Sequence, residues 1–298
     1  MALFAKRVLA VFLICCVAST NYLKANPTPP AAKGDPTKGI HVQYGSLSCQ
    51  EYYYYLPENL SGVKNIVFMI HGGAWSTGGC SQFTEQAVAA AKSGYISVSM
   101  DHRKIQNGAN AFDMVRDIAD AVGSLKKQLN SKNIRFDKMA VAGWSSGAHL
   151  ALLYAYEYYF NSSPIPVAFM CVCAAPTDFL DDAYSGRTFM GQMANSLMTS
   201  LSGEVILPGT ESSHMNAIKK ISPVYLVKKG VPPTIIVNGD DDDVVPPSNS
   251  AKLYNELRKN GVDAVRIIYK GAGHFLGSRF PENKVRTQVF MQFADKYF

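Results

Sequence analysis

Hydrophobic and polar residues form two kinds of pattern along this chain. Short, nearly continuous apolar runs recur from residue 65 onwards, and segments with apolar residues spaced three and four apart lie between them. Runs of the first kind are typical of strands covered on both faces, and segments of the second kind are typical of amphipathic helices. The pattern predicts strands at 40–44, 50–56, 65–70, 95–100, 139–142, 167–174, 234–237 and 264–269, and helices at 81–93, 111–129, 148–158, 248–260 and 283–297.

The order of these elements predicts an α/β fold. Strands that alternate with helices form a mostly parallel sheet with helices on both faces. No helix separates the first two strands, so we expect an antiparallel edge at the N-terminal end of the sheet. Residues 179–222 break the alternation and include four methionines. An insertion over a functional site and irregular packing are the two interpretations of this region.

The N-terminal segment has the pattern of a secretory signal peptide. Lys6 and Arg7 precede an apolar run of 11 residues, Val8–Ala18, and small and polar residues follow it. The run is shorter than the roughly 20 apolar residues that cross a bilayer, so we expect no stable membrane span. We assign 1–25 to the signal peptide, 26–38 to a flexible leader and 39–298 to one folded domain, with 179–222 as its candidate insertion.

This assignment predicts a secreted, periplasmic or extracellular protein. Cleavage after Ala18 is the alternative to cleavage after Ala25. Two other interpretations stay open, namely a lipoprotein anchored through Cys16 and a short N-terminal helix that the mature chain retains. The lipoprotein is disfavoured because Cys15, rather than Gly or Ala, precedes Cys16.

Composition and charge exclude several classes of protein. The chain has 298 residues, of which 47% are hydrophobic and 17% are charged, so it can bury a large core and is not globally disordered. Its net charge is +6, and three of those positive charges fall in the first 25 residues. The remaining excess is weak and scattered, so we expect no nucleic-acid partner. The oligomeric state stays open.

Four cysteines lie beyond the predicted signal peptide. No two of them form a CxxC pair, so the sequence gives no support to a structural zinc site. Cys171 and Cys173 share one face of a predicted strand and are poorly placed to bond to each other. Cys49 and Cys80 are the better disulfide candidates in an oxidising compartment, but the sequence leaves their pairing open.

A serine lies at the sharpest predicted turn of the chain. Gly143-Trp144-Ser145-Ser146-Gly147 fits the pattern G-x-S-x-G, follows a predicted strand and opens a predicted helix. This is the context of a nucleophile elbow, in which a strained turn presents the serine above the edge of the sheet. Ser145 is therefore the candidate nucleophile.

A glycine-rich loop follows the third predicted strand. His71-Gly72-Gly73-Ala74-Trp75 lets backbone N–H groups approach a ligand closely, as stabilisation of an oxyanion requires. In the nucleophile-elbow arrangement, this loop supplies N–H donors together with the residue that follows the nucleophile. The predicted donors are therefore Gly73, Ala74 and Ser146, and we expect His71 to brace the loop.

A histidine and an acidic run follow the last two predicted strands. His274 lies in a Gly-rich loop, and Asp242 lies within four successive aspartates, 240–243. With Ser145 they have the order Ser, Asp, His along the chain, so Asp242 is the candidate acid that orients the His274 base. Asp178 and the other three aspartates are rival acids. A cation site needs spaced ligands, so we do not expect a metal here. The chemistry of a serine, histidine and acid needs no other cofactor, so we expect none.

These motifs resemble those of α/β-hydrolases, in the group of esterases related to prolyl oligopeptidases. The chain is most similar to small feruloyl-esterase-like and acyl-esterase members. The resemblance rests on HGGAW at 71–75, GWSSGAHLA at 143–151 and SPVYLVKKGVPPTIIVNGDDDDVVP at 222–246. It implies a single α/β-hydrolase domain with Asp242 as the acid. The chain departs from the family pattern at Asn238, where a histidine is usual, and at Ala74, where a third glycine is common.

The resemblance and the motifs together predict a secreted serine carboxylesterase. It would hydrolyse feruloyl, acetyl or other carboxylic esters, on small molecules or on polysaccharides, through an acyl-enzyme and without a cofactor. A serine peptidase of the prolyl-oligopeptidase type and a small-amide (formamide) hydrolase are the enzymatic alternatives. A catalytically inactive binding protein is the alternative from another class, but such relatives typically lose a residue of the triad.

Overall fold

The computed structural model describes residues 33–184, 189–207, 209–277 and 281–298. The predicted signal peptide, and the predicted leader up to residue 32, lie outside the described residues, so the structure does not test them. Within the described residues, no helix combines the length and the apolar character that a membrane span requires.

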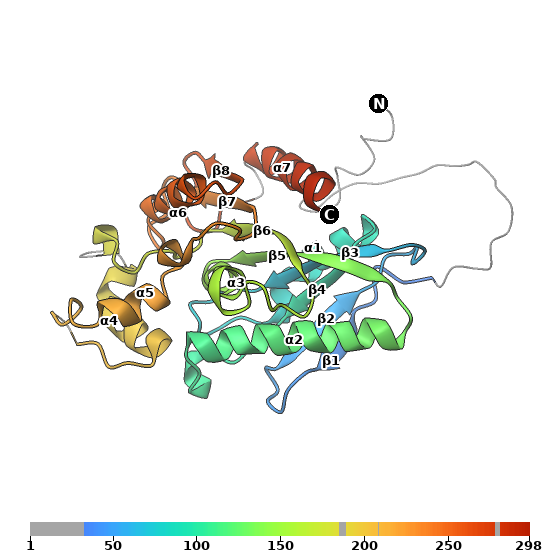
Figure 1. The fold of residues 1–298 in the computed structure, drawn as a ribbon, viewed down its shortest axis with the longest axis horizontal. Helices are drawn as coiled ribbons and strands as arrows, with labels where there is room; N and C mark the ends of the chain where they lie inside the picture. The colour runs from blue at the N-terminus through green and yellow to red at the C-terminus, as the bar shows by residue number, and fades with distance from the viewer. Residues whose placement is uncertain (1–32, 185–188, 208, 278–280) are drawn as a thin grey trace, which may run out of the picture.

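Eight strands form one sheet, in the order β1-β2-β4-β3-β5-β6-β7-β8 (Figure 1). The strands are β1 (Ile40–Gln43), β2 (Glu51–Tyr55), β3 (Lys64–Ile70), β4 (Ile96–Met100), β5 (Phe136–Trp144), β6 (Val167–Cys173), β7 (Thr234–Gly239) and β8 (Ala264–Tyr269). The pairs β1–β2 and β2–β4 are antiparallel, and all other neighbours are parallel. The predicted sheet with its antiparallel N-terminal edge is confirmed.

Helices cover both faces of this sheet, as the alternation of elements predicts. The helices are α1 (Thr84–Lys92), α2 (Ala111–Ser131), α3 (Ser146–Leu153), α4 (Phe189–Ser202), α5 (Met215–Lys220), α6 (Pro247–Lys259) and α7 (Glu282–Tyr297). Short 3-10 turns lie at 80–83, 105–107, 182–184 and 223–226, and a π turn at 154–158 extends α3. Buried residues of α2, α3 and α6 share one core with the sheet, and those of α1 and α7 share the other. Figure 1 shows α2 and α7 on opposite sides of the sheet.

Local sequence explains where the longest helix begins. The Asn110 side chain accepts hydrogen bonds from the amides of Phe112 and Asp113, and the Asp113 side chain accepts one from the amide of Asn110. This reciprocal cap satisfies amides that have no partner in the first turn of a helix. By contrast, β5 begins three residues before the predicted strand, because the charged Asp137 and Lys138 hide its partly exposed start from the hydrophobic pattern.

The region 179–222 contains α4 and α5 and no strand among its described residues. Leu197, Leu201 and Ile218 are buried in the same core as the sheet and α2. Phe179 packs against Trp75 of the glycine-rich loop, with ring centroids 5.9 Å apart. The region therefore extends the core next to that loop. Met190 and Met193 have side chains outside the described set.

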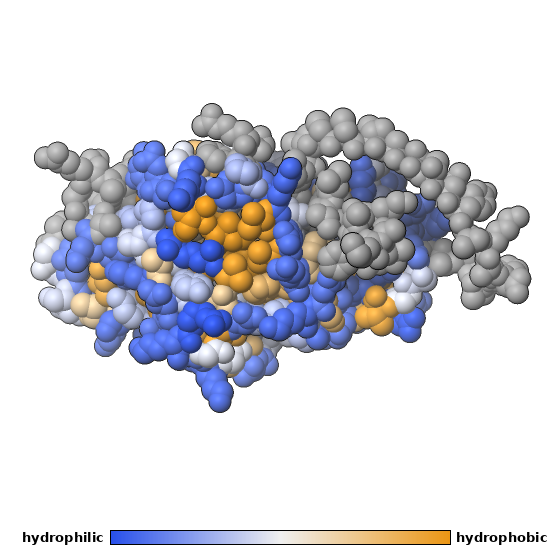
Figure 2. All heavy atoms as spheres, turned by 90° about the horizontal axis from the view of Figure 1, so that it is seen from above, coloured by the Kyte–Doolittle hydropathy of each residue, from blue (hydrophilic) through white to orange (hydrophobic). Residues whose placement is uncertain are grey.

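Apolar side chains also reach the surface. Figure 2 shows a hydrophobic area enclosed by hydrophilic residues on the face seen from above. β8 is an edge strand of the sheet, and its Val265 and Ile268 are only half-buried.

Cys49 and Cys80 are both free thiols, and their sulfur atoms lie against Asn107 and Glu51 respectively rather than forming a disulfide.

Candidate active site

Ser145 lies at the turn between β5 and α3. Its backbone has φ 52° and ψ −123°, a strained conformation for a residue with a side chain. The Ser145 amide donates to the carbonyl oxygen of Cys173 on the neighbouring strand, at 2.8 Å. A Cβ atom on Gly147 would lie 2.2 Å from the backbone oxygens of Ile70 and His71. Glycine is thus required where α3 crosses the end of β3, and this close approach fixes the turn.

The structure brings Ser145, His274 and Asp242 together. The Nε2 atom of His274 lies 3.0 Å from Oγ of Ser145, and its Nδ1 atom lies 2.9 Å from Oδ2 of Asp242. Oδ1 of Asp242 accepts hydrogen bonds from the amides of Val244 and Val245, at 3.0 and 2.8 Å. Asp242 and His274 are both buried. The carboxylate is therefore fixed by the backbone and in turn orients the imidazole.

The rival acidic residues have other contacts. Asp178 is buried and pairs with Lys252, at 2.9 Å. Asp240, Asp241 and Asp243 are exposed. Asp240 accepts a hydrogen bond from the amide of Gly271, which ties the acidic turn to the loop that carries His274. Among the described aspartates, Asp242 is the one bonded to His274. The catalytic roles of the three residues remain predictions.

The glycine-rich loop that carries two of the predicted oxyanion donors passes beside Ser145. A Cβ atom on Gly72 would lie 3.2 Å from Cβ of Ser145, so the loop passes directly against the serine. Gly73, Ala74 and Trp75 have φ values of 128°, 50° and 56°, and the amides of residues 76 and 77 turn back to the carbonyl oxygen of Gly73. Within the described part of the chain, the Gly73 and Ala74 amides donate to no acceptor. Ser146 is the first residue of α3, so its amide has no partner within the helix.

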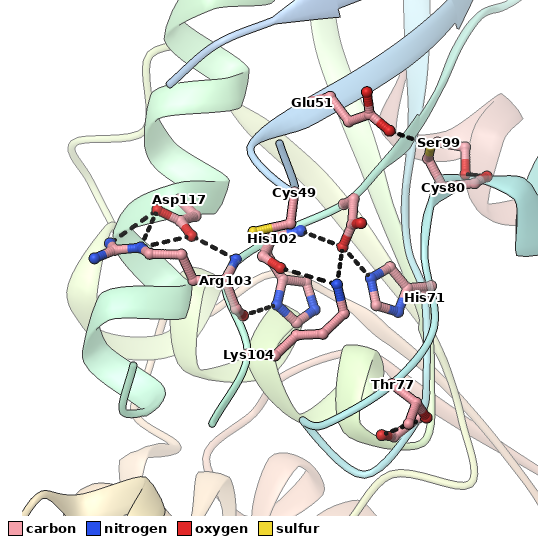
Figure 3. Close-up of polar contacts among 12 residues, drawn as sticks. Cys49, Glu51, His71, Thr77, Cys80, Ser99, His102, Arg103, Lys104 and Asp117 are labelled. Carbon is pink, nitrogen blue, oxygen red and sulfur yellow. Dashed lines mark hydrogen bonds and ion pairs between the residues drawn. The ribbon is translucent and has the colours of Figure 1, made fainter. Parts of the chain in front are cut away.

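A buried network of polar side chains supports this loop (Figure 3). His71 contacts the carbonyl oxygen of Gly72 through Nδ1, at 2.7 Å, and Oδ1 of Asp101 through Nε2, at 2.9 Å. Lys104 donates to the same Asp101 oxygen, at 2.7 Å. Burial raises the pKa of Asp101, but the hydrogen bonds from His71 and Lys104 outweigh it and lower that pKa overall. His71 therefore braces the loop, as we expect from the sequence.

His102 packs flat against His71, with ring centroids 4.6 Å apart. Burial and the nearby charge of His71 lower the pKa of His102 to about 3, so the ring is neutral near pH 7. Its Nδ1 atom then donates to the carbonyl oxygen of Arg103. Sequence reasoning missed Asp101, His102 and Lys104. The available signal was their place directly after β4, at the same edge of the sheet as the loop.

A second missed contact holds the loop from the side. Trp75 donates through Nε1 to Nδ1 of His149 on α3, at 3.1 Å, and Nε2 of His149 contacts the carbonyl oxygen of Ile221, at 2.7 Å. Burial lowers the pKa of His149 to about 4. The neutral ring therefore connects the glycine-rich loop, α3 and the end of the region 179–222.

This arrangement has the parts that acyl transfer requires. A hydroxyl lies within hydrogen-bond reach of an imidazole, and a buried carboxylate orients that imidazole. The loop that passes against Ser145 carries the Gly73 and Ala74 amides, which have no acceptor among the described residues. Amides of this kind can stabilise the negative charge that develops on an attacked carbonyl oxygen. No group of three or more His, Cys, Asp or Glu side chains is arranged to hold a metal ion in the described residues.

Proteins of known sequence are similar to most of this chain. An isoprenylcysteine alpha-carbonyl methylesterase of Arabidopsis thaliana is 24% identical over 242 residues, covering 78% of this chain and 55% of its own length. A probable carboxylic ester hydrolase, LipM, of Mycobacterium tuberculosis is 23% identical over 248 residues, covering 80% of this chain and 54% of its own. The chain thus spans about half the length of the curated relatives it matches.

Solved structures show the same fold. A truncated carbohydrate esterase from gut microbiota superposes with a TM-score of 0.71 at 20% identity, covering 88% of this chain and 99% of that one. Esterase B from Lactobacillus rhamnosis superposes with a TM-score of 0.70 at 17% identity, covering 89% of this chain and 88% of that one. The family model named BD-FAE matches residues 54–257, which is more than half of the chain. The chain therefore belongs to the BD-FAE family, and the α/β-hydrolase resemblance drawn from its sequence is confirmed.

Proposed function

We propose that this protein is a serine hydrolase of carboxylic esters. The observation that carries the proposal is the chain of hydrogen bonds from Ser145 through His274 to Asp242. It lies beside a loop whose Gly73 and Ala74 amides have no acceptor among the described residues. Nucleophile, base, orienting acid and oxyanion donors thus occupy one edge of the sheet.

The proposed reaction has two halves. Oγ of Ser145 attacks the ester carbonyl while Nε2 of His274 takes its proton, and Asp242 stabilises the resulting imidazolium. The amides of Gly73, Ala74 and Ser146 stabilise the oxyanion. His274 then protonates the departing alcohol, which leaves an acyl group on Ser145. Water, deprotonated by His274, releases the acid in the second half.

The relatives support ester hydrolysis over the other two reactions. Two of them are named a methylesterase and a carboxylic ester hydrolase, and the superposed structures are named esterases. One further structure is of an esterase 2 phosphonylated by sarin. A peptidase of the prolyl-oligopeptidase type and a formamide hydrolase use similar groups, so they are the alternatives that an assay must separate.

We also propose that the enzyme acts outside the cytoplasm on acetyl or feruloyl esters. The basic flank and apolar run of residues 6–18 support export. The family resemblance is the sole support for an acetyl or feruloyl group as the acyl portion of the substrate. Mass measurement of the mature N-terminus would test the proposed signal peptide, because export predicts loss of the first 18 or 25 residues.

The test of the function compares p-nitrophenyl acetate, methyl ferulate, N-formylkynurenine and an aminoacyl-proline p-nitroanilide. We expect the wild type to hydrolyse at least one ester much faster than either amide, and Ser145→Ala to abolish this. Ser131→Ala is the matched control, since Ser131 is exposed at the end of α2 and its hydroxyl donates to the carbonyl oxygen of Gln128. Faster cleavage of either amide than of both esters would contradict the proposal.

A further inference from the structure

Phe275 exposes its ring immediately beside the candidate base. It follows His274 in the chain, and 75% of its surface is accessible, the largest fraction among the exposed large hydrophobic residues of the described part of the chain. An exposed aromatic ring leaves apolar surface in contact with water, which is unfavourable until something covers it. It lies next to the buried His274, but this side chain has no role in the proposed reaction steps.

The ring is held in place. Its centroid lies 5.2 Å from that of Trp144 and 5.6 Å from that of His274, at interplanar angles of 88° and 82°. The ring centroids of Trp144 and His274 also lie 6.0 Å apart. Edge-to-face contacts of this kind are favourable between aromatic rings. The three rings, which we call the aromatic rim (Trp144, His274 and Phe275), therefore border Ser145 as one unit.

The backbone around Phe275 also restricts it. Leu276 is buried and has φ 51°, in the left-handed region, and its amide donates to the carbonyl oxygen of Gly273, at 3.2 Å. A non-glycine residue adopts this conformation at a cost of the order of 1–3 kcal/mol, so surrounding contacts must hold it. The resulting tight turn points the chain back and leaves Phe275 outermost, while Leu276 is anchored in the core.

The position of the rim decides which part of an ester it can contact. In the proposed reaction, the oxyanion faces the amides of Gly73, Ala74 and Ser146, and the departing oxygen faces Nε2 of His274, which protonates it. Phe275 is the neighbour of His274 and touches its ring. The alcohol portion of the ester, rather than its acyl portion, therefore lies next to Phe275.

We propose that Phe275, supported by Trp144, forms a subsite for the alcohol portion of the substrate and selects alcohols that carry an aromatic ring. The inference rests on the proposed ester hydrolysis. Stacking of a flat ring against Phe275 would cover the exposed aromatic surface and add a contact to the rim. A small alcohol such as ethanol is too short to make that contact.

The test compares phenethyl acetate with ethyl acetate. Both esters give the same acetyl-enzyme, so a difference in kcat/KM between them arises before the alcohol departs. We expect the wild type to prefer phenethyl acetate, and Phe275→Ala to lower the ratio of the two kcat/KM values by roughly tenfold, as expected for loss of one aromatic contact and its buried area. Phe275→Tyr, which keeps the ring, should retain most of the ratio.

Two controls separate the alternatives. Val63→Ala changes another exposed apolar residue, which is 56% accessible. Val63 precedes the first residue of β3, so it lies at the opposite end of the strands from Ser145. This variant should leave the ratio of the two kcat/KM values unchanged. Ethyl hydrocinnamate carries its ring on the acyl side. Two results with Phe275→Ala would overturn the subsite. One is a fall in kcat/KM for ethyl hydrocinnamate but not for phenethyl acetate. The other is a ratio of kcat/KM for phenethyl acetate over ethyl acetate that stays within twofold of the wild type. If the wild type hydrolyses none of the three esters, the proposed function fails rather than the subsite alone.

Discussion

The Nδ1 atom of His274 lies 2.9 Å from Oδ2 of Asp242, a buried carboxylate whose other oxygen is bonded to two backbone amides. This contact fixes the tautomer in which Nε2 is free to accept a proton from Ser145. Asp242→Asn should keep the geometry but favour the wrong tautomer. We expect kcat for ester hydrolysis to fall by about 10⁴, the loss known for the same substitution in a serine protease.

The neighbouring aspartates provide the control for that variant. Asp241 and Asp243 are exposed and have no side-chain contact with His274. Asp241→Asn and Asp243→Asn should therefore keep kcat within about twofold of the wild type, since exposed charges of this kind contribute little. A larger loss in either variant than in Asp242→Asn would mean that the orienting acid is misassigned.

Two helical glycines should respond to alanine in opposite directions. Gly147→Ala would place Cβ 2.2 Å from two backbone oxygens, so α3 must shift away from β3. Gly123 lies within α2, and its added Cβ would meet only Pro164, at 3.9 Å. Urea unfolding should show a loss of about 1–3 kcal/mol for Gly147→Ala and a gain of roughly 0.5–1 kcal/mol for Gly123→Ala.

The activity of these two variants gives a second measurement. Because Gly147 lies two residues after Ser145, the shift of α3 displaces the serine, and kcat should fall at least tenfold. Gly123→Ala should retain wild-type activity. Equal stability and equal activity in the two variants would show that the close approach of α3 to β3 is not required.

The residues Asp101, Lys104 and His71, which support the glycine-rich loop, should be energetically coupled. Lys104→Met removes the ammonium group that donates to the buried carboxylate of Asp101. The bond between Asp101 and the His71 ring is kept. We expect the free energy of unfolding to fall by about 3 kcal/mol and kcat to fall, because the loop loses its support. In a double-mutant cycle with Asp101→Asn, the double variant should lose less than the sum of the single variants by about 1 kcal/mol or more. Additive losses would contradict the coupling.

The motifs of the candidate site could be predicted from the sequence because their geometry is local. Gly143 and Gly147 flank Ser145 because only glycine permits the close approach of α3, and that requirement leaves a fixed spacing in the sequence. The same holds for the 71–75 loop, whose backbone conformation depends on adjacent residues. Asp242 needed two further facts. The first is the order Ser, Asp, His along the chain, and the second is the family resemblance that distinguishes it from the three neighbouring aspartates.

Other parts of the molecule depend on packing that no local pattern records. Asp101 and His71 are 30 residues apart and meet because β3 and β4 are neighbours in the sheet. The 179–222 region lies in the connection between the parallel strands β6 and β7, and its described residues include α4 and α5. Its contact with Trp75 arises only in the folded core. Phe275 is apolar, so the sequence pattern alone suggests a buried residue, whereas the strained Leu276 takes the buried place.

Stability should fall in mild acid because His149 is buried as a neutral ring. Its pKa is about 4 in the folded protein, against ~6.5 for an unfolded histidine, so the unfolded state binds more protons below pH ~6.5. The free energy of unfolding therefore keeps its full value above pH ~6.5 and falls as the pH drops towards 4. The loss due to His149 is roughly 2 kcal/mol at pH 5. His102, with a pKa of about 3, contributes in the same direction.

Urea unfolding of the wild type and His149→Gln at pH 7.5 and pH 5 isolates this contribution. The variant loses the bonds to Trp75 and Ile221 and should be less stable at pH 7.5. The difference between the two proteins should narrow at pH 5, because the variant has no histidine to protonate there. A difference that stays constant or widens would show that His149 does not titrate on unfolding.

The most direct test of the account is covalent labelling of the nucleophile. We predict that an organophosphonate inactivates the protein with one phosphonyl group per chain, and that peptide mapping places it on Ser145, since His274 activates this serine. Ser145→Ala should remain unlabelled and fold normally. Stoichiometric labelling of a different residue, or full ester hydrolysis by Ser145→Ala, would contradict the serine mechanism.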